Sequence, residues 1–569
     1  MKGFLIKQKD ILKEIFTNKK ERGLFLLITL FIILNTVKIS VFNYIISNNK
    51  SLTAIEYKIM YTFFVMTIFF ALILLAKSRI LFLSVYILQT LYIIINISYY
   101  LYFHSYLHIL QFLVLFNEGF AAARQNSAPI SVEMLVALID LPGFILIYRN
   151  FNKIVYLRPD RRLLRIITLL IPIFFLGAFE IKNYNSDLSI IQLINNRYNG
   201  ENPIVERYGT VVNNVVGIYL NRNEKAITSR FVYGKTQSGK EVNKEKPNFL
   251  FIQVESMDSN VISKRNKGEY LVPFLHNLSQ NCVFYPYVLS EHMGGGTSDI
   301  EFSVINSIEP LEGYSAQKLS SYNYPNSFIK IMKKSTYSAY AFHGNKGDFF
   351  NRNVSFPKMG FNKFIDMDAM GLKDVGWGAP DKDVFNFAYD YLSKIKPPFI
   401  SYIITMTSHG PFTNAGYYYN NTLFNDVKNT NIKNYLNSMS YVDKCLQEFV
   451  KKVRENFKNT YIIIYGDHTP DIKSDEYMQA SFDFENKYFE FVPLFIITPD
   501  DKKYFENKKV ASMLDLSPTA LMASGVSFKV KSAGANLLDF NGEPTGIIFK
   551  NKIYDRNFLY NKVSSIFPH

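Results

Sequence analysis

The chain has 569 residues, of which 48% are hydrophobic, and a formal net charge of +15. This length exceeds what one domain usually needs, and only two cysteines are present, which excludes a disulfide-rich fold and a C-x-x-C metal or redox motif. Cys282 and Cys445 are expected to be buried free thiols, with a single disulfide as the alternative. No zinc-knuckle spacing or basic-aromatic motif is present, so no nucleic-acid partner is expected.

Long apolar runs are confined to the first third of the chain. A membrane-spanning helix needs about 20 apolar residues. Four runs meet this length, and a fifth is weaker because it contains Glu133, Asp140 and Pro142: they cover residues 24–47, 59–76, 80–103, 164–182 and, for the weaker one, 131–148. The short apolar segment 105–117 is interpreted as re-entrant or interfacial. The sequence therefore predicts a multi-pass helical membrane domain of five spans over residues 1–182.

Basic residues flank alternate spans. The segment 1–22 contains seven Lys or Arg residues, and the loops at 77–79 and 149–165 are also basic, whereas the other loops are poor in basic residues. The positive-inside rule places the basic set in the cytoplasm and everything after residue 182 outside it. Asp140 is either a functional intramembrane group or a residue that pairs inside the bundle or lies near an interface.

The segment 183–247 is polar and mixed. Its second part, 221–247, has no sustained apolar period and is typical of a linker. An amphipathic stretch at 211–220 is expected to form a helix that lies on the membrane or docks on the outer domain.

Short apolar runs separated by helical patterns begin at residue 248. The expected strands are 248–254, 337–342, 399–406, 460–465 and 492–498. Near-continuous apolar strands that alternate with helices predict a mostly parallel sheet covered on both faces, in an α/β domain over 248–569.

Polar residues follow four of these strands. Glu255 follows the first, His343 the second, His409 the third, and Asp467 with His468 the fourth. Ligands of α/β sheets bind at the carboxyl ends of the strands, so these side chains are expected to meet at one edge. Asp, His and Glu together suit Zn²⁺ or Mn²⁺.

A candidate nucleophile lies in the segment EHMGGGTSDIEF (291–302). Three glycines precede Thr297, and a helical pattern follows it. A helix N-terminus favours an anion, and a bound divalent metal lowers the pKa of a hydroxyl. Thr297 is therefore expected to cap the helix, to act as the nucleophile, or to do both.

Five motifs occur in one order along the chain: VES (254–256), GGGTSDIEF (294–302), FHGNKGDFFNRN (342–353), SHGPF (408–412) and YGDHTP (465–470). Together with the five-span first part, they resemble the lipoteichoic acid synthase and phosphoglycerol transferase family of the alkaline phosphatase–sulfatase superfamily. The resemblance covers nearly the whole chain and implies a sulfatase-like α/β fold for the outer domain.

The resemblance also implies the roles of individual residues. Glu255, Thr297, Asp467 and His468 would hold one Mn²⁺, with Zn²⁺ or Mg²⁺ as alternatives, and Thr297 would be the nucleophile. His343 and His409 would line the substrate pocket and move protons. Arg352 would contact glycerol phosphate. Phe350 occupies the position where the family usually has a tryptophan, and its aromatic ring could still stack on the substrate. These are expectations from the matching motif positions.

A second family-like segment is GWGAPDKDVF (376–385). In it Asp381 is expected to be a helix N-cap, and Trp377 is expected to pack against its neighbours.

The implied activity is transfer of glycerol phosphate from a membrane phospholipid, phosphatidylglycerol, to a glycan or polyglycerolphosphate acceptor through a phosphothreonine. The implied location is a bacterial cytoplasmic membrane, with the catalytic domain outside the cytoplasm. Three alternatives stay open: a phosphoethanolamine transferase of the same superfamily, a phosphatase, and a non-enzymatic membrane receptor or assembly factor.

Overall fold

The structure is a computed structural model that describes most of the chain. The described residues are 19–46, 52–103, 107, 109–114, 116, 131–155, 162–183, 189–190, 202–220 and 223–567, the last range with gaps at 243–244, 294, 312–313, 320, 411, 413–423, 425, 473–475, 486, 505–508, 541–545 and 551. The chain forms two compact units, one with most of residues 1–220 and the other with residues 221–569. The domain limits expected at residues 182 and 247 stay predictions.

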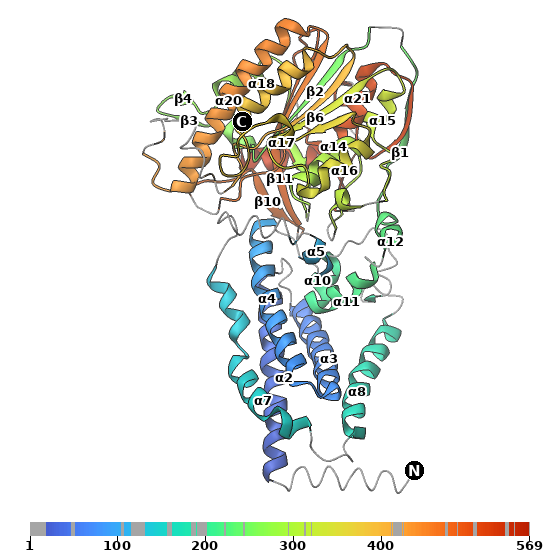
Figure 1. Cartoon of the computed structure of the whole chain (residues 1–569), viewed down its shortest axis with the longest axis vertical. Coiled ribbons are helices and arrows are strands. Elements are labelled where there is room, and N and C mark those ends of the chain that lie inside the picture. Colours follow the sequence, from blue (N-terminus) through green and yellow to red (C-terminus); the bar gives the residue numbers. More distant parts are fainter. Residues whose placement is uncertain are drawn as a thin grey trace. The chain divides into compact units, whose positions relative to one another are not determined.

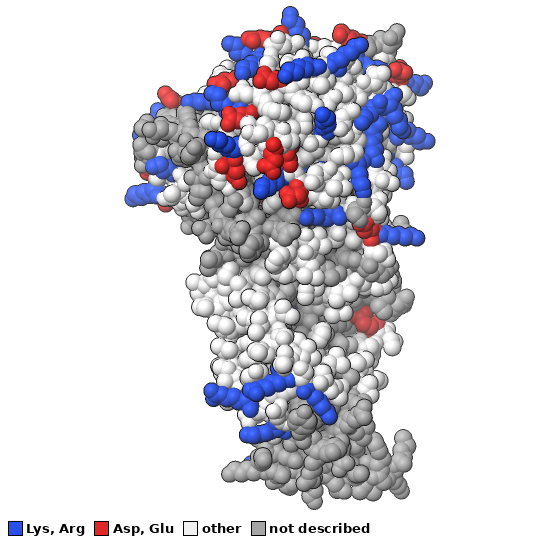
Figure 2. All heavy atoms as spheres, in the orientation of Figure 1, with Lys and Arg blue, Asp and Glu red and all other residues white. Residues whose placement is uncertain are grey.

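The first unit is helical throughout its described part (Figure 1). Its elements are α2 (Lys19–Ile45), α3 (Leu52–Ala76), α4 (Arg79–Phe103), α5 (Ile109–Val114), η1 (Val132–Leu138), α7 (Leu141–Val155), α8 (Arg162–Lys182), α10 (Asn202–Tyr208) and α11 (Thr210–Leu220). Few charged side chains appear on the described surface of this unit, whereas they are spread over the other unit (Figure 2).

The prediction of five membrane spans is corrected to three. Among the described residues, three helices are long and apolar enough to cross a membrane: Arg22–Ile45, Ile55–Ala76 and Arg79–Leu101. The predicted span over 131–148 is divided between η1 and α7, and α7 has only 15 residues, about 22 Å of helix. The predicted span over 164–182 lies in α8. The side chains of residues 162–169 are not described, and α8 is not among the three helices that are long and apolar enough to cross a membrane.

The break between η1 and α7 carries a buried ion pair. The Nζ atom of Lys38 lies 2.8 Å from Oδ2 of Asp140, and neither side chain is exposed. Asn35 and Tyr86 donate hydrogen bonds to the same carboxylate over 2.6 and 3.2 Å, and Lys38 also donates to Gln89 over 2.7 Å. Asp140 thus pairs inside the helical unit, which is one of the two alternatives that the sequence left open. The pairing matters because an unpaired charge is costly there.

Segments of the predicted linker take part in both units. Helices α10 and α11 pack on α3 through a cluster that includes Tyr61, Tyr208 and Val212. Strand β1 (Lys235–Gly239) pairs antiparallel with β13 (Phe528–Ser532) in the second unit. The expected helix at 211–220 is confirmed as α11.

The second unit is built around a nine-stranded sheet. Its strands are β2 (Asn248–Val254), β5 (Val283–Ser290), β6 (Ser338–His343), β7 (Lys363–Ile365), β8 (Phe399–Ile404), β9 (Thr460–Gly466), β10 (Ser481–Phe484), β11 (Lys487–Ile497) and β12 (Ala511–Ser512). The order is β12-β5-β11-β9-β2-β8-β6-β7, with β10 paired to β11. The expected strands over 248–254, 337–342, 399–406 and 460–465 are confirmed with small shifts at their ends.

The sheet is mixed, and β11 is the strand that breaks the parallel pattern. It runs antiparallel to both β9 and β5. The prediction that 492–498 joins a parallel sheet is therefore wrong in direction. The described part of the connection from β9 to β11 contains β10 and no crossover helix, and a parallel neighbour would need such a crossover.

Helices cover both faces of the sheet. The longer ones are α13 (Pro273–Ser279), α14 (Thr297–Asn306), α15 (Phe328–Lys333), α16 (Arg352–Met359), α18 (Asp381–Leu392), α20 (Thr430–Asn456), α21 (Leu516–Ser524) and α22 (Arg556–Ile566). The shorter elements are α12 (Glu224–Thr228), η3 (Ser259–Val261), β3 (Arg265–Asn266), β4 (Glu269–Tyr270), η4 (Ala316–Lys318), η5 (Phe349–Asn351), α17 (Met367–Met370), η6 (Met513–Asp515), β14 (Ile547–Phe549) and β15 (Lys552–Tyr554).

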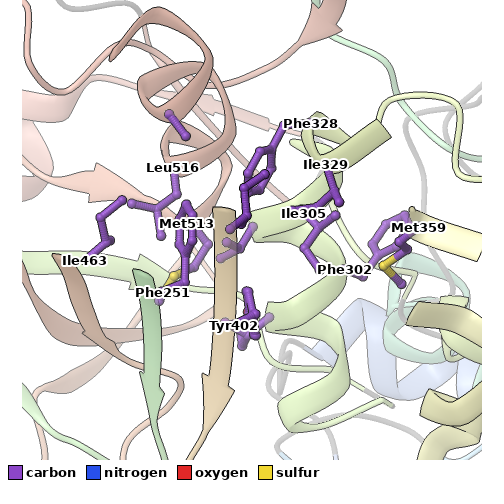
Figure 3. Close-up of a cluster of buried hydrophobic side chains, with 14 of the residues drawn as sticks. Phe251, Phe302, Ile305, Phe328, Ile329, Met359, Tyr402, Ile463, Met513 and Leu516 are labelled. Carbon is purple, nitrogen blue, oxygen red and sulfur yellow. The ribbon is translucent and has the colours of Figure 1, made fainter. Parts of the chain in front are cut away.

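Alternate residues of the central strands supply two hydrophobic cores. Phe251 and Tyr402 point to the face covered by α14, α15 and α21 (Figure 3), whereas Leu250 and Ile403 belong to the core under α18 and α20. All seven residues of β2 are buried. A strand buried on both faces is apolar at most positions, as residues 249–252 and Val254 are. The two polar residues of β2, Asn248 and Gln253, are buried and hydrogen-bonded to neighbouring strands.

Candidate metal centre and nucleophile

Four adjacent parallel strands end at the same edge of the sheet. In the order β9-β2-β8-β6 they lead to Asp467, Glu255, the segment with His409, and His343. The sequence predicted this convergence from the residues that follow each strand, and the parallel pairing confirms it.

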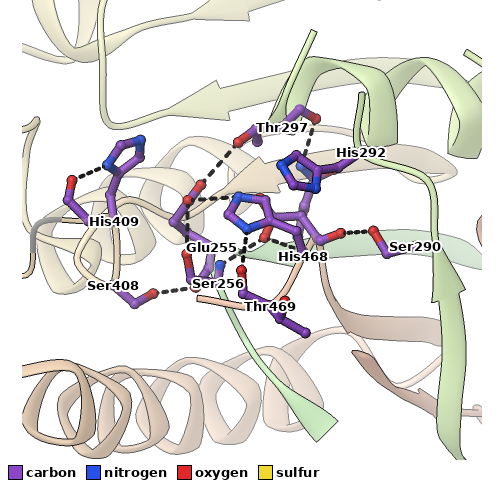
Figure 4. Close-up of polar contacts among 12 residues, drawn as sticks. Glu255, Ser256, Ser290, His292, Thr297, Ser408, His409, His468 and Thr469 are labelled. Atoms are coloured by element: carbon purple, nitrogen blue, oxygen red, sulfur yellow. Dashed lines mark hydrogen bonds and ion pairs between the residues drawn. The ribbon is translucent and has the colours of Figure 1, made fainter. Parts of the chain in front are cut away.

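Glu255, Asp467 and His468 form a compact buried group. One ligand atom from each lies within 4.8 Å of the others, and all three residues are buried. The Nε2 atom of His468 is 3.2 Å from Oε1 of Glu255 and 3.7 Å from Oδ2 of Asp467. Figure 4 shows Glu255 and His468 facing each other, with Thr297 beside them.

Hydrogen bonds to the backbone fix the orientation of the Asp467 carboxylate and of the His468 ring. Oδ1 of Asp467 accepts the N–H groups of Ser256 and His468, each over 2.8 Å, while its Oδ2 is buried without a hydrogen-bond partner. The ring of His468 donates from Nδ1 to the carbonyl of Thr469 over 2.8 Å, because a carbonyl only accepts. Oδ2 of Asp467 is thus available to a cation, and Nε2 of His468, which faces Glu255 and Asp467, could bind one in place of its contact with Glu255.

The backbone next to Glu255 adopts a strained conformation. Ser256 has φ +53°, a region that costs a non-glycine residue about 1–2 kcal/mol. In this conformation its hydroxyl donates to Oε1 of Glu255 over 3.2 Å, and its carbonyl accepts the Tyr435 hydroxyl over 2.8 Å. Strain of this kind is found where the surroundings fix a functional group.

The electrostatics of the Glu255–Asp467–His468 group favour a bound positive ion. Burial and the neighbouring Glu255 carboxylate raise the pKa of Asp467 well above its usual value. Burial disfavours the charged form of Glu255, but the His409 and His468 imidazoles hold the pKa of this carboxyl below its usual value. Two buried carboxylates that face one imidazole repel each other, and a divalent cation relieves that repulsion.

Thr297 is the first residue of α14, at the helix start that the sequence predicted. The expected capping role of Thr297 is corrected, because Gly296 is the N-cap and no side chain caps this helix. Its hydroxyl donates to Oε2 of Glu255 over 3.2 Å. The preceding Gly296 has φ +54° and ψ −137°, a conformation open in practice only to glycine. A Cβ on Gly295 would lie 2.1 Å from Oδ1 of Asp299, so this glycine is required by close packing.

Asp299 holds the glycine loop from the first turn of α14. Its Oδ2 accepts the N–H groups of Met293 and Gly295 over 3.0 and 2.8 Å. Burial raises the pKa of this carboxyl to about 8. The loop that carries the candidate nucleophile is therefore tied down by its own helix.

His343 and His409 interact electrostatically with Glu255 of the buried Glu255–Asp467–His468 group. Nδ1 of His409 donates to the carbonyl of Gly410 over 2.6 Å, and Nδ1 of His343 to that of Ile404 over 3.4 Å, which leaves each Nε2 as an acceptor. Burial lowers the pKa of both imidazoles. Both imidazoles are therefore neutral at neutral pH, and Nε2 of each can accept a proton.

The loop that carries His409 is held by Asp381 and packed by Trp377. The Asp381 carboxylate accepts the N–H groups of Met406 and Thr407 over 2.6 and 3.2 Å. The expected N-cap role of Asp381 is corrected, because Pro380 is the N-cap and Asp381 is the first residue of α18. The Trp377 ring lies 4.6 Å from the His409 ring, consistent with packing.

Arg352 is engaged by a carboxylate of the protein. Its Nη2 and Nε atoms donate to Oε1 of Glu301 over 2.6 and 2.9 Å, and both side chains are buried. The Phe350 ring lies 5.5 Å from the guanidinium carbon. The positive charge of Arg352 also acts on the site: after burial, it contributes to lowering the pKa of the His343 and His409 imidazoles.

Sequence reasoning missed two site residues. The His292 ring stacks on the His468 ring with centroids 4.6 Å apart, and its Nδ1 lies 2.7 Å from Oε2 of Glu490. The one signal for His292 was its position just before the glycines of the Thr297 loop. Glu490 had no signal, because it precedes an apolar strand segment that lies far from the loop in sequence.

The comparisons with known proteins agree with this geometry. Residues 247–526 match the sulfatase family. The chain is 25% identical over 333 residues to a lipoteichoic acid synthase-like protein, YvgJ, of Bacillus subtilis, covering 55% of this chain and 53% of that protein. It is 32% identical over 265 residues to the lipoteichoic acid synthase of Staphylococcus saprophyticus, covering 43% and 40%. The matched stretches thus span about half the length of these relatives.

A structural comparison covers more of the chain. The lipooligosaccharide phosphoethanolamine transferase EptA of Neisseria meningitidis, an integral membrane protein, has a TM-score of 0.54 at 14% identity, over 91% of this chain and 99% of that one. At this identity the likeness concerns the fold, helical unit included. Residues 247–526 of the chain thus form a domain that matches the sulfatase family, and the chain is similar to lipoteichoic acid synthases over about half of its length.

Proposed function

We propose that the protein is a membrane-bound phosphotransferase that moves glycerol phosphate from phosphatidylglycerol to an envelope polymer or glycan. The observation that carries this proposal is the position of the Thr297 hydroxyl, 3.2 Å from Glu255, at the start of α14 and beside a buried Asp–His–Glu group. A hydroxyl in that position serves as a nucleophile toward phosphorus. The similarity to lipoteichoic acid synthases supports the choice of glycerol phosphate.

Glu255, Thr297, Asp467 and His468 would hold one divalent metal, Mn²⁺ in this proposal, with Zn²⁺ or Mg²⁺ as alternatives. The unpartnered Oδ2 of Asp467 and the inward Nε2 of His468 fit such an ion. When bound, the ion supplies positive charge that lowers the pKa of the threonine hydroxyl and offsets the charge of the phosphate oxygens.

In the first half-reaction, Oγ1 of Thr297 attacks the phosphorus of the lipid. A bond forms between Oγ1 and phosphorus, and the bond from phosphorus to the diacylglycerol oxygen breaks. The proton that the Thr297 hydroxyl gives up passes through Nε2 of His409 or of His343 to the leaving oxygen, which departs as diacylglycerol, while Thr297 retains the glycerol phosphate ester. The first N–H groups of α14 and the helix dipole favour the phosphate oxygens at this position.

In the second half-reaction, an acceptor hydroxyl attacks the phosphothreonine. Nε2 of His409 or of His343 accepts the proton of that hydroxyl, since both rings are neutral and donate through Nδ1. The Oγ1–phosphorus bond breaks, and Oγ1 takes the proton held by that imidazole, which regenerates the Thr297 hydroxyl. This is a two-step exchange of the ping-pong type.

Arg352 and Phe350 are proposed to line the substrate pocket. A guanidinium has five N–H donors; Glu301 accepts from Nε and from one N–H of Nη2, so the two of Nη1 and the second of Nη2 are not bonded to it. Nη1 lies 3.4 Å from the carbonyl of Phe349, which leaves donor capacity for a phosphate or a glycerol hydroxyl. The Phe350 ring offers an apolar surface beside it.

The protein is proposed to lie in a bacterial cytoplasmic membrane with its sulfatase domain outside the cytoplasm. Three spans, like five, are an odd number and place the two ends of the membrane part on opposite sides. The basic N-terminal segment favours the cytoplasmic side for the first end. The same chain thus presents a catalytic domain to the leaflet that supplies its lipid donor.

The test is incubation of the detergent-solubilised full chain with Mn²⁺ and headgroup-labelled phosphatidylglycerol. We expect release of diacylglycerol and a mass increase of one glycerol phosphate on the peptide that contains Thr297. Thr297→Val, which keeps the shape and removes the hydroxyl, should lower turnover roughly a thousandfold or more.

Parallel reactions separate the alternatives. Labelled phosphatidylethanolamine in place of phosphatidylglycerol identifies a phosphoethanolamine transferase, and release of free glycerol phosphate to water identifies a phosphatase. Turnover of neither lipid, together with no mass change on Thr297, would assign the chain to a non-enzymatic role.

A further inference from the structure

Behind the candidate metal ligand His468 lies a second layer of polar residues that the proposed reaction does not use. His292 and Glu490 are both buried, with side chains 5% and 6% exposed, and form an ion pair of 2.7 Å. The His292 ring is stacked on the His468 ring at an interplanar angle of 24°. Figure 4 shows the two imidazoles face to face, on the side of His468 that is turned away from Ser256.

These residues close a ring of contacts around His468. Nδ1 of His468 donates to the carbonyl of Thr469, and the Thr469 hydroxyl donates to Oε1 of Glu490 over 2.7 Å. Oε2 of Glu490 binds His292, whose ring returns to His468 by stacking. The His468 ring is thus fixed at its Nδ1 edge and on one face, and its remaining Nε2 edge points to Glu255 and Asp467.

The residues that contact His468 belong to, or directly follow, strands of the sheet. Glu490 lies in β11 and is paired across the antiparallel ladder with Ser290, the last residue of β5. His292 follows β5 by two residues and begins the loop that leads to Thr297. The ladder therefore determines the separation of His292 and Glu490, and it links the metal ligand to the nucleophile loop.

We propose that His292 and Glu490 are positioning residues that orient His468 and thereby set the affinity of the centre for its divalent cation. This inference rests on the proposed metal-dependent function. Partners behind a ligating histidine hold its ring in the binding orientation, and their loss typically weakens metal binding about 10- to 100-fold.

A purely structural role makes a different prediction. A buried imidazole–carboxylate pair stabilises the fold, and its loss then lowers the unfolding temperature without a specific effect on the metal. Metal affinity and metal-free stability must therefore be measured separately.

The experiment compares four full-length proteins in detergent: wild type, His292→Phe, Glu490→Gln and the double variant. His292→Phe keeps a ring for stacking and removes the bond to Glu490, while Glu490→Gln keeps the shape and removes the charge. The matched control is His276→Phe, since His276 also stacks on an aromatic ring, that of Tyr270, and bonds a backbone carbonyl with Nδ1. Isothermal titration with MnCl₂ gives the Kd, and thermal unfolding with EDTA gives the metal-free stability.

We expect each single variant to raise the Kd for Mn²⁺ about 10- to 100-fold. The double variant should raise it no more than the larger single effect, because both changes break the same pair. His276→Phe should leave the Kd unchanged. If one variant does not fold, the other carries the same comparison.

Two results would overturn the inference: an unchanged Kd in folded His292→Phe and Glu490→Gln, or an equal loss in His276→Phe. A lower unfolding temperature with unchanged affinity would assign the pair to fold stability alone. Wild-type protein that binds no Mn²⁺, Zn²⁺ or Mg²⁺ would instead contradict the metal centre itself, which distinguishes the two failures.

Discussion

The guanidinium of Arg352 lies against the carboxylate of Glu301 with Nη2 and Oε1 2.6 Å apart, and both side chains are almost fully buried. Gln317 donates to Oε2 of the same carboxylate over 2.7 Å. The residue expected to contact substrate thus also belongs to the core polar network between α14 and α16. Any test of Arg352 has to separate these two roles.

Removal of one partner of this pair should be strongly destabilising. Arg352→Met and Glu301→Leu each leave a buried charge without its partner, which typically costs about 3–5 kcal/mol of unfolding free energy. The double variant should regain most of that loss. Denaturant unfolding of the four proteins measures the cycle.

Activity of the double variant then reports on substrate contact. If Arg352 binds the phosphate, the refolded double variant stays inactive in the labelled-lipid reaction although its stability is restored. Recovery of transfer with stability would assign Arg352 to the core alone.

Removal of divalent metal should destabilise the sulfatase domain. An ion that binds only the folded state at about 100 times its Kd adds about 2.7 kcal/mol. We expect EDTA to lower the unfolding temperature and added Mn²⁺ to restore it. Asp467→Asn is the matched change, because it removes one of the three grouped ligands, and it should abolish the shift. A Mn²⁺-induced shift of full size in that variant would contradict the assigned ligand set.

Stability of the metal-free protein should fall as pH rises, in part through Asp299. Burial raises the pKa of this carboxyl to about 8, far above the value of about 3.9 in an unfolded chain. The folded state therefore holds a proton that the unfolded state releases, so this stabilising contribution is complete below about pH 4 and is lost as pH rises through about 8.

Asp299→Asn should remove that dependence. The amide is the neutral isostere of the protonated acid, and its oxygen still accepts the N–H groups of Met293 and Gly295. The unfolding temperature of the variant relative to wild type should rise steadily from pH 5 to pH 9 in EDTA. A difference that does not change with pH would contradict the raised pKa.

Substitution of Gly295 should disturb the nucleophile loop through packing alone. A Cβ at this position would lie 2.1 Å from Oδ1 of Asp299 and 2.9 Å from the Ser298 hydroxyl. Gly295→Ala should cost about 1–3 kcal/mol of stability and lower transfer as well. Gly371→Ala is the control, since its Cβ meets nothing within 4 Å and its φ of +68° adds only about 1–2 kcal/mol of strain. Full transfer by Gly295→Ala would show that the loop tolerates the extra atom.

The Lys38–Asp140 pair should hold the broken helix in the first unit. Lys38→Met leaves the buried carboxylate with only its bonds from Asn35 and Tyr86, and we expect a loss of about 3–5 kcal/mol. The double variant Lys38→Met with Asp140→Leu should recover most of it. Thermal unfolding in detergent measures both. Equal stability of all three proteins would show that the pair contributes nothing.

Local sequence patterns were sufficient to locate five of the nine sheet strands and the segment of the candidate nucleophile, whereas β5, β7, β10 and β12 were not predicted. The apolar run at 248–254 became β2 with the same limits, and Thr297 begins α14 as its glycines and the following helical period indicated. A strand buried on both faces is made mostly of apolar residues, so a short, nearly continuous apolar run can be recognised in the sequence. The same holds for the ligands that follow parallel strands, because topology brings those ends together.

Contacts between distant residues could not be predicted in this way. The antiparallel direction of β11 is set by its pairing with β9 and β5, and Asp140, at the break between η1 and α7, pairs with Lys38, 102 positions away. The pairing of Arg352 with Glu301 and of His292 with Glu490 likewise joins different elements.

The sequence by itself thus determined the division into an apolar helical part and an α/β part, the central strands, and the polar residues at their carboxyl ends. Only the tertiary structure decided the number of candidate spans, the direction of β11 and the partners of the buried charges. The physical reason is that hydrophobic periodicity acts over neighbouring residues, whereas a buried charge is stabilised by whichever opposite group the fold brings within about 3 Å of it.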